Sequence, residues 1–317
     1  MPSSLVFTPP APDVLAAIAA LETQDAVVLT LPWRALAITG PDAQTFLQGQ
    51  FTTDMREVTP TQSRLGCLLN LKGRVQISGR LLAWPDGYVL LLPAAQFEPA
   101  RARLGKYGVF SKISLSELPL RIQGVIGTIA AHDAADADTC TGDSLPLRVR
   151  LPGLARALWL SSAQDEPSMA DTAAAGSIEA EAALQYWASA AIAAGEWTLD
   201  LAESELFQPQ EMDYHALQGI SYQKGCYLGQ EIVARLYFRG QLKTELSAWL
   251  TATDCPSIQA GDALLDSEGL RVGEVIRAAC LGTGQALLLA QTKRESEACS
   301  LQSDTGLVSL ARQPFQR

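Results

Sequence analysis

The segment 207–243 holds the side chains best suited to chemistry, with Cys226 near its centre. Lys224, Arg235 and Arg239 bring positive charge to this stretch of a chain whose net charge is −10. A thiol near cations has a lowered pKa and a larger thiolate fraction, and the thiolate is the form that attacks electrophiles and binds metals. These residue types therefore predict a functional cysteine at position 226.

Position 226 also has a structural interpretation, which the sequence leaves open. Free cysteine is among the most buried residue types, so Cys226 could be a small packing residue in a turn. Gly225 and Gly229 flank it at positions −1 and +3, where glycine permits close backbone approach or unusual dihedral angles. Gln230 and Glu231 are typical of a helix start, because a carboxylate favours the positive end of the helix dipole. That assignment is compatible with a functional role.

The length and composition indicate a folded protein of several domains. The chain has 317 residues, which is too long for one ordinary core and predicts two or three domains. Hydrophobic residues make up 48% and charged residues 18% of the chain. The net charge of −10 argues against a broad nucleic-acid surface, because such surfaces are usually basic. A small basic strip formed by Lys224, Arg235, Arg239 and Lys243 keeps local nucleic-acid binding open as a lesser alternative.

The cysteines and the chain start predict an intracellular environment. The six cysteines form no Cys-x-x-Cys pair and lie far apart, which argues against a zinc site or a disulfide framework. Residues 1–13 contain four prolines and no basic start, unlike a signal or transit peptide. No apolar run reaches the ~18–20 residues of a membrane span. We therefore expect reduced thiols and a cytoplasmic protein.

Apolar patterning predicts interleaved strands and helices in the first part of the chain. This mixture, with hairpins among the strands, favours an α+β sheet layer. The expected strands are 26–31, 35–39, 64–71, 75–83 and 88–92, and the expected helices are 13–21, 42–49, 97–105 and 179–194.

Two kinds of segment complete the expected organisation. Residues 130–143 and 164–177 are small and acidic with few large apolar groups, so we expect exposed loops there. After Gln241, short apolar runs alternate with glycines and charges, a rhythm that predicts a small all-β barrel.

The string KGCYLGQE at 224–231 resembles the signature of the YgfZ family. This is a family of bacterial folate-binding proteins linked to tRNA modification and to iron–sulfur enzymes, within a superfamily that includes the glycine cleavage T-protein. The resemblance extends over roughly residues 25–115 and 180–245. The supporting landmarks are Ile38-Thr39-Gly40, Gln48-Gly49-Gln50, Thr53-Asp54, Lys72-Gly73, residues 106–112, Pro209-Gln210, Val233-Ala234-Arg235 and Phe238-Arg239-Gly240.

The resemblance implies a fold and a domain division. The family's α+β fold has three lobes around a central hole, with ferredoxin-like folate-binding lobes and a C-terminal β-barrel. By analogy, we expect a folate-binding module of two partly interleaved lobes over residues 1–240 and a barrel domain over residues 241–317. We expect a monomer.

The resemblance also implies tetrahydrofolate or a derivative as the cofactor. A folate site needs a flat apolar wall for the pterin, further apolar surface for the aminobenzoate and cations for the glutamate tail. The two tryptophans of the family's folate site match Trp33 and Trp187, and Arg235 and Arg239 are the candidate cations. Both tryptophans also fit structural roles, Trp187 in the apolar stripe of its helix and Trp33 in a strand.

For function, the resemblance implies a folate-dependent accessory protein that serves iron–sulfur enzymes or assembly factors, and through them tRNA modification. Cys226 would act as a redox or nucleophilic thiol or as a transient iron–sulfur ligand. Lys224, Tyr227, Gln230 and Glu231 would complete its site. The link to tRNA would be indirect, in keeping with the negative charge of the chain.

The alternative is a folate-dependent one-carbon transferase of the aminomethyl type. The T-protein uses an aspartate after a strand of its folate domain, whereas the matching stretch 93–98 offers only Glu98 as a carboxylate. A longer acid does not keep the same geometry, and ~1 Å of misplacement can be costly in catalysis. His132 and His215, the only histidines, give no support for a two-histidine metal site.

Overall fold

The computed structural model describes residues 27–315 except 128–129, 131–135, 143–144, 154–155, 165–179, 252–256, 281–284, 295, 297 and 304–305. The helix expected at 13–21 and nearly all of the loop expected at 164–177 lie outside the described residues. Within the described part of the chain, the helices are too short or too polar to traverse a lipid bilayer.

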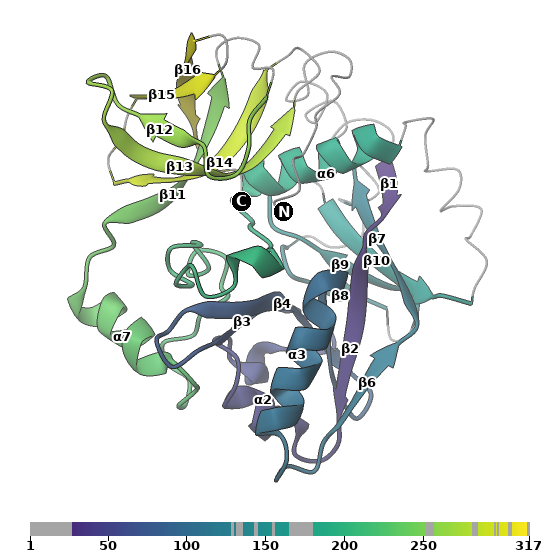
Figure 1. Cartoon of the computed structure of the whole chain (residues 1–317). Coiled ribbons are helices and arrows are strands. Elements are labelled where there is room, and N and C mark those ends of the chain that lie inside the picture. The colour runs from purple at the N-terminus through teal and green to yellow at the C-terminus, as the bar shows by residue number, and fades with distance from the viewer. Residues whose placement is uncertain are drawn as a thin grey trace.

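The first antiparallel sheet has the strand order β3-β4-β5-β2-β6. Along β2, Leu36 and Ile38 turn to one face and Ala35 to the other, as the period of two in a strand requires. The first face packs under helices α2 and α3 (Figure 1). The elements are β2 (Trp33–Thr39), α2 (Ala43–Gln48), the short 3-10 helix η1 (Met55–Glu57), β3 (Arg64–Leu69), β4 (Val75–Trp84), β5 (Gly87–Pro93), α3 (Ala94–Tyr107) and β6 (Ser114–Leu118).

The second antiparallel sheet has the order β1-β7-β10-β9-β8 and packs against the free face of the first. Along β10, Leu158 and Leu160 enter the apolar cluster between the two sheets, while Ala157 and Trp159 lie on the opposite face. Four of these strands, β7 to β10, were not expected from the sequence. The strands are β1 (Val27–Thr30), β7 (Leu120–Ile126), β8 (Cys140–Thr141), β9 (Leu147–Arg150) and β10 (Arg156–Ser162).

The expectation of an exposed loop over 130–143 is wrong for its second half. Asp138 is 4% exposed and Cys140, in the edge strand β8, is buried. The carboxylate of Asp138 pairs with the guanidinium of Arg80, itself 2% exposed. A buried guanidinium requires a counter-charge, and this requirement draws the acidic segment inward although it has little apolar surface of its own.

The C-terminal part forms a closed barrel of six strands, as expected. Its interior is apolar and centres on Trp249, Leu264 and Leu288. The strands are β11 (Thr244–Thr251), β12 (Ala263–Leu265), β13 (Arg271–Cys280), β14 (Ala286–Lys293), β15 (Ala298–Ser303) and β16 (Gly306–Gln313). The α+β fold class is thereby confirmed, whereas the domain division at residue 240 stays a prediction.

The barrel docks on α6 (Ala180–Ala194) and on the irregular segment that comes after it (Figure 1). This segment contains the 3-10 helix η2 (Leu201–Glu203) and leads to α7 (Gln230–Arg239). Arg277 of β13 donates to Glu203 at 2.8 Å and lies 3.1 Å from Asp200. These ion pairs tie the barrel to the residues that lead to the signature motif.

Four buried charges lie where the two sheets meet the end of α6. Glu196 accepts a hydrogen bond of 2.6 Å from Arg156 and lies 3.5 Å from Arg80, which also pairs with Asp138. Burial raises the pKa of Glu196, but the charges of Arg156 and Arg80 outweigh it and hold that pKa below its usual value. The cluster holds two positive and two negative charges, so the interior carries no net charge there.

We expect Glu196→Gln to lower the free energy of unfolding by about 3–5 kcal/mol, because it leaves two buried guanidiniums with one carboxylate. Denaturant unfolding near pH 7 measures this change, and Glu98→Gln is the control because Glu98 lies 62% exposed. Glu196 has a lowered folded pKa, so its contribution is present above the unfolded value of 4.5 and is lost as pH falls through the folded one. Equal effects of the two substitutions at neutral pH would contradict the importance of the cluster.

Candidate functional site

The signature motif begins with a buried lysine. The Lys224 side chain is 5% exposed, and its Nζ donates to the carbonyl oxygens of Phe51 and Thr53 at 2.6 and 2.7 Å. The same Nζ lies 5.0 Å from the ring centroid of Tyr227. Burial lowers the pKa of Lys224 to about 7. This side chain therefore fastens the motif to the connection between α2 and β3.

Tyr227 and Leu228, which follow Cys226, hold the motif in place on its other side. Tyr227 is buried in the central apolar cluster, and burial raises the pKa of its hydroxyl. The Leu228 N–H donates to the Gly49 carbonyl at 3.2 Å. Residues on both sides of position 226 are thus held against the 49–53 segment, which fixes the course of the turn between them.

Cys226 itself is exposed between these two attachments. Cys67, Cys140 and Cys299 are buried and Cys280 is half-buried. Burial raises the pKa of Cys67 and that of Cys299, and raises the pKa of Cys140 to about 11. Among the cysteines that the structure describes, Cys226 is therefore the thiol most open to reagents and partners.

The two glycines of the motif have different structural roles. Gly229 has φ of +83°, and a Cβ there would lie 2.6 Å from the carbonyl oxygen of Asn70. At the adjoining Gly73, a Cβ would lie 2.9 Å from Cβ of Ile232. The start of α7 consequently packs backbone to backbone on the β3–β4 hairpin. A Cβ at Gly225 would meet no atom within 4 Å, so only the second glycine is required for close approach.

Helix α7 begins at Gln230, as the sequence predicts, with Glu231 exposed in its first turn. Val233 is its buried contact, and the carbonyl of Val233 accepts from Nε2 of Gln210 at 2.8 Å. Arg235 and Arg239 lie on the exposed side of the helix.

Trp33 and Trp187 both pack against one apolar cluster. Both are half-buried and pack against the side chains enclosed between the two sheets. The indole of Trp187 lies over Gly124 of β7, where a Cβ would approach its ring to 2.8 Å. The Arg156 guanidinium carbon lies 5.5 Å from the centroid of the same ring.

The expected site residues therefore fall into two groups. Lys224, Tyr227, Gln230 and Glu231 surround the turn of Cys226, with α7 carrying the two arginines beside the β3–β4 hairpin. Trp33 and Trp187 belong to β2 and α6, which lie across the molecule from α7 (Figure 1). Arg235 and Arg239 are thus separate from the tryptophans, with which they were expected to share a folate site.

Sequence reasoning missed the polar residues beside the motif. Asp54 accepts hydrogen bonds from the side chain of Gln48 and from Arg56, and the bonds from Arg56 lower the pKa of Asp54 to about 2. His215, expected in the motif region, lies 5.4 Å from the ring of Tyr222, at the wall of a cavity of ≈ 630 Å³. Gln48 and Asp54 stood in the landmark strings, but no pattern indicated their pairing. His132 lies outside the described residues.

Comparison with known proteins places the chain in a family. No family model matches the sequence. The tRNA-modifying protein YgfZ of Shigella boydii serotype 18 is 33% identical over 284 residues, which cover 85% of this chain and 86% of the relative. The YgfZ protein of Escherichia coli O157:H7 has the same identity and coverage. The chain belongs to the YgfZ family.

The resemblance expected from KGCYLGQE is thereby confirmed for the family. The fold has a solved counterpart in the glycine cleavage system aminomethyltransferase T from Bartonella henselae, with a TM-score of 0.75 and coverage of 95% of this chain and 88% of that one. The sequence identity of 14% makes this likeness one of fold alone. It confirms the T-protein-like arrangement that the sequence predicted.

Gly229→Ala and Gly225→Ala form a matched pair that tests how the turn is held. We expect Gly229→Ala to lower the free energy of unfolding by about 1–3 kcal/mol, because φ of +83° is strained for alanine and the methyl group meets Asn70. Gly225→Ala should leave stability nearly unchanged. Thermal melts of both variants measure the difference, and comparable losses would show that the packing of α7 on the hairpin is not what requires Gly229.

Lys224 gives a pH dependence of stability. Its folded pKa of about 7 lies below the usual value of 10.5, so between these values the unfolded chain binds more protons. The contribution of Lys224 to stability should therefore rise as pH increases from 7 to 10.5. A neutral amine still has two N–H groups for the two carbonyls. Relative to Lys224→Met, the wild type should gain stability over this window in urea unfolding, and parallel pH profiles would contradict the assignment.

Proposed function

We propose that this YgfZ-family chain binds tetrahydrofolate and supports the iron–sulfur enzymes that modify tRNA in the cytoplasm. The observation that carries the proposal is the exposed Cys226 in a turn fastened on both sides. The names of its relatives, tRNA-modifying protein YgfZ, support the connection to tRNA modification. The T-protein-like fold supports the connection to folate.

The tryptophan face suits the flat ring of a pterin. Trp33 and Trp187 offer two half-buried indoles on one apolar cluster, and Gly124 leaves room for the second of them. Arg156 lies against Trp187 and keeps a buried Nε without a hydrogen-bond partner. The two indoles therefore offer the flat apolar surface on which a pterin ring stacks.

In this proposal, the protein's residues bind and orient the ligand. Tetrahydrofolate supplies a reduced pterin and a carrier for one-carbon units. Trp33 and Trp187 exclude water from the ring faces, and the buried Arg156 guanidinium lies against the Trp187 indole. Arg235 and Arg239 lie away from this wall on α7, so the proposal does not assign them the glutamate tail.

In this proposal, Cys226 is the side chain that reacts with, or binds iron from, a partner protein. Lys224 and Tyr227 hold the turn from beneath, while Gln230 and Glu231 begin the helix beside it. A thiol that protrudes between two anchored residues can reach a protein partner without rearrangement of the fold. It can then act as a nucleophile or redox thiol, or ligate iron transiently. The partner we propose is an iron–sulfur enzyme or assembly factor.

The aminomethyltransferase alternative receives less support from the site. It requires a carboxylate beside the substrate amine, and Glu98 is the candidate. Glu98 is exposed on α3 and lies 3.5 Å from both Arg34 and Arg101. An exposed carboxylate engaged by two arginines is not positioned beside a substrate amine. Turnover of methylenetetrahydrofolate with an aminomethyl donor would favour this alternative over the accessory role.

Tetrahydrofolate should quench the tryptophan fluorescence of the wild type. The double variant Trp33→Phe/Trp187→Phe should bind at least tenfold more weakly, because it loses the wall on which the ring stacks. Trp159→Phe is the matched control, since Trp159 lies on the opposite face of β10. Unchanged affinity in the double variant, measured by calorimetry, would refute the folate site.

Cys226 should be alkylated faster than the buried thiols in the native protein. Its exposure gives access, whereas burial raises the pKa of Cys67, Cys140 and Cys299 and lowers their thiolate fraction. Competitive labelling with iodoacetamide at pH 7, followed by peptide mass spectrometry, ranks the rates. If Cys226 reacted no faster than Cys67, the proposal of an accessible functional thiol would fail.

A further inference from the structure

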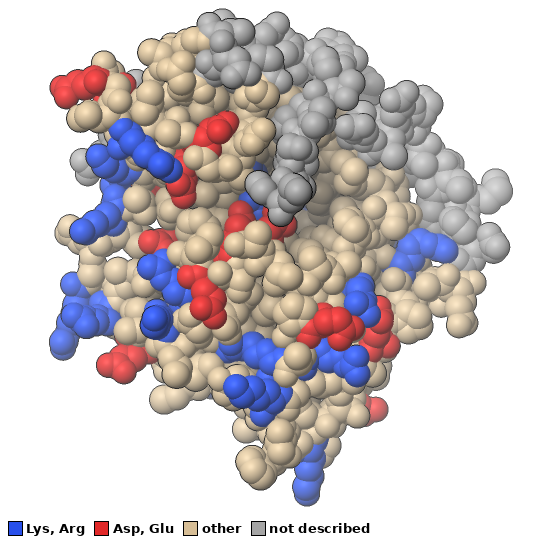
Figure 2. All heavy atoms as spheres, viewed as in Figure 1, with Lys and Arg blue, Asp and Glu red and all other residues tan. Residues whose placement is uncertain are grey.

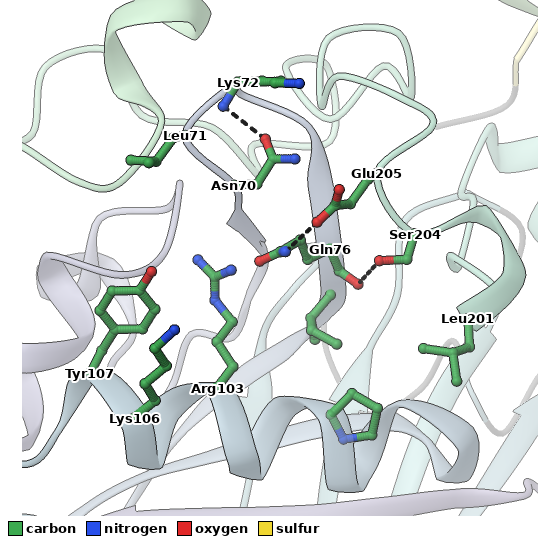
Figure 3. Close-up of a pocket in the computed structure, with 12 residues that line it drawn as sticks. Asn70, Leu71, Lys72, Gln76, Arg103, Lys106, Tyr107, Leu201, Ser204 and Glu205 are labelled. Atoms are coloured by element: carbon green, nitrogen blue, oxygen red, sulfur yellow. Dashed lines mark hydrogen bonds between the residues drawn. The ribbon is translucent and has the colours of Figure 1, made fainter.

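A cavity of ≈ 520 Å³ lies between α3, the β3–β4 hairpin and the segment after η2 (Figure 3). It is separate from both groups of expected site residues, because neither Cys226 nor the two tryptophans line it. Arg103, Lys106 and Tyr107 rise into it from α3 (Figure 3).

One wall of this cavity is cationic. Arg103 donates through Nη2 to the carbonyl of Leu69, which fixes the guanidinium in place. Its Nε is buried and has no hydrogen-bond partner. Lys106 is exposed at the mouth, and Lys72 lies on the rim. Within the described residues, no ion pair of 4.0 Å or less joins Arg103 or Lys106 to a carboxylate, and Glu205 across the cavity acts on Arg103 only at longer range.

The facing wall offers hydrogen-bond acceptors. Gln76 donates through Nε2 to Glu205, while its Oε1 is buried without a partner. Glu205 has φ of +68°, a conformation that few residues other than glycine adopt, and its N–H donates to Val75 at 2.7 Å. The Ser204 hydroxyl donates to the carbonyl of Gln76 at 3.2 Å. The acceptors are thus held opposite the cations.

We propose that this cavity binds a hydroxylated phosphate of the ribose-phosphate type. The phosphate would accept from Nε of Arg103 and from Lys106, since two cations suit a group with more than one negative oxygen. A sugar hydroxyl would donate to Oε1 of Gln76 or to Glu205. A simple carboxylate would leave the acceptor wall unpartnered, and a neutral sugar would leave Lys106 and Nε of Arg103 without a negative oxygen in direct contact.

The ribose phosphate can belong to a free nucleotide or to RNA. The cavity adjoins further cations, because the hairpin that forms its rim also packs against α7 with Arg235 and Arg239. Figure 2 shows Lys and Arg side chains over α7 and along α3 on this face, with Asp and Glu side chains among them. Binding by RNA would engage both sets, whereas a free nucleotide would need the cavity alone.

Calorimetry on the full chain tests the site with ribose 5-phosphate, ribose, inorganic phosphate and an unmodified tRNA as separate probes. Arg103→Gln and Lys106→Gln should each weaken ribose 5-phosphate binding at least tenfold. Lys106→Gln guards against misfolding, because its side chain is exposed. Lys112→Gln makes the same charge change outside the cavity and should have no effect.

A substitution on α7 distinguishes RNA from a free nucleotide as the source of the ribose phosphate. If RNA is the source, tRNA should bind more tightly than ribose 5-phosphate, and Arg235→Gln should weaken tRNA binding alone. If a free nucleotide is the source, Arg235→Gln should change neither the affinity for tRNA nor the affinity for ribose 5-phosphate. The proposal is overturned if the wild type binds neither ribose 5-phosphate nor tRNA, or if ribose binds as tightly as ribose 5-phosphate. It is also overturned if Arg103→Gln and Lys106→Gln both bind ribose 5-phosphate like the wild type. Tetrahydrofolate quenching in these variants should be normal, so this test is independent of the folate proposal.

Discussion

The buried ammonium of Lys224 is the constraint on which the signature turn depends. Removing an ammonium group from water is unfavourable unless its N–H groups find acceptors, and Lys224 finds them in the carbonyls of Phe51 and Thr53. These two hydrogen bonds hold the start of the 224–231 turn against the 51–53 segment. Tyr227 and Gly229 then fix the path of the chain into α7, one by filling the central cluster and the other by letting α7 approach the β3–β4 hairpin. Cys226 is exposed as a consequence of these neighbouring attachments.

The rest of the molecule supplies the surfaces against which this turn is held. The two sheets enclose one apolar cluster, and the Arg80, Asp138, Glu196 and Arg156 charges close it at the end of α6. The barrel is tied through Arg277 to the segment between α6 and the turn. The turn, the tryptophan face and the barrel consequently depend on one irregular stretch, residues 195–229. Its course is fixed by local turn hydrogen bonds and by contacts with all three sheets.

The sequence predicts the parts of this structure that follow local rules. Strand β4 begins with alternating apolar and polar residues, β2 and the barrel strands contain short apolar runs, and α6 repeats apolar residues at helical spacing. The pattern therefore predicts these elements. The start of α7 at Gln230 and the family both follow from one specific string. The buried charges cannot be predicted in this way, because Asp138 lies in a stretch whose composition is that of a solvated loop. Its position depends on Arg80, 58 residues earlier in the chain. The separation of Arg235 from Trp187 likewise depends on how α7 packs, which spacing along the chain does not encode.

The central claim is that the exposed thiol of Cys226 carries the function. Its most direct test is complementation of a bacterial strain that lacks its own family member, with methylthio-modified tRNA nucleosides quantified by mass spectrometry. Cys226→Ala and Cys226→Ser change an exposed side chain, so both purified variants should melt like the wild type. We expect both to fail to restore the modification, since neither methyl nor hydroxyl can exchange thiols or ligate iron as a thiolate does. A variant that melts normally and restores full modification would contradict the account.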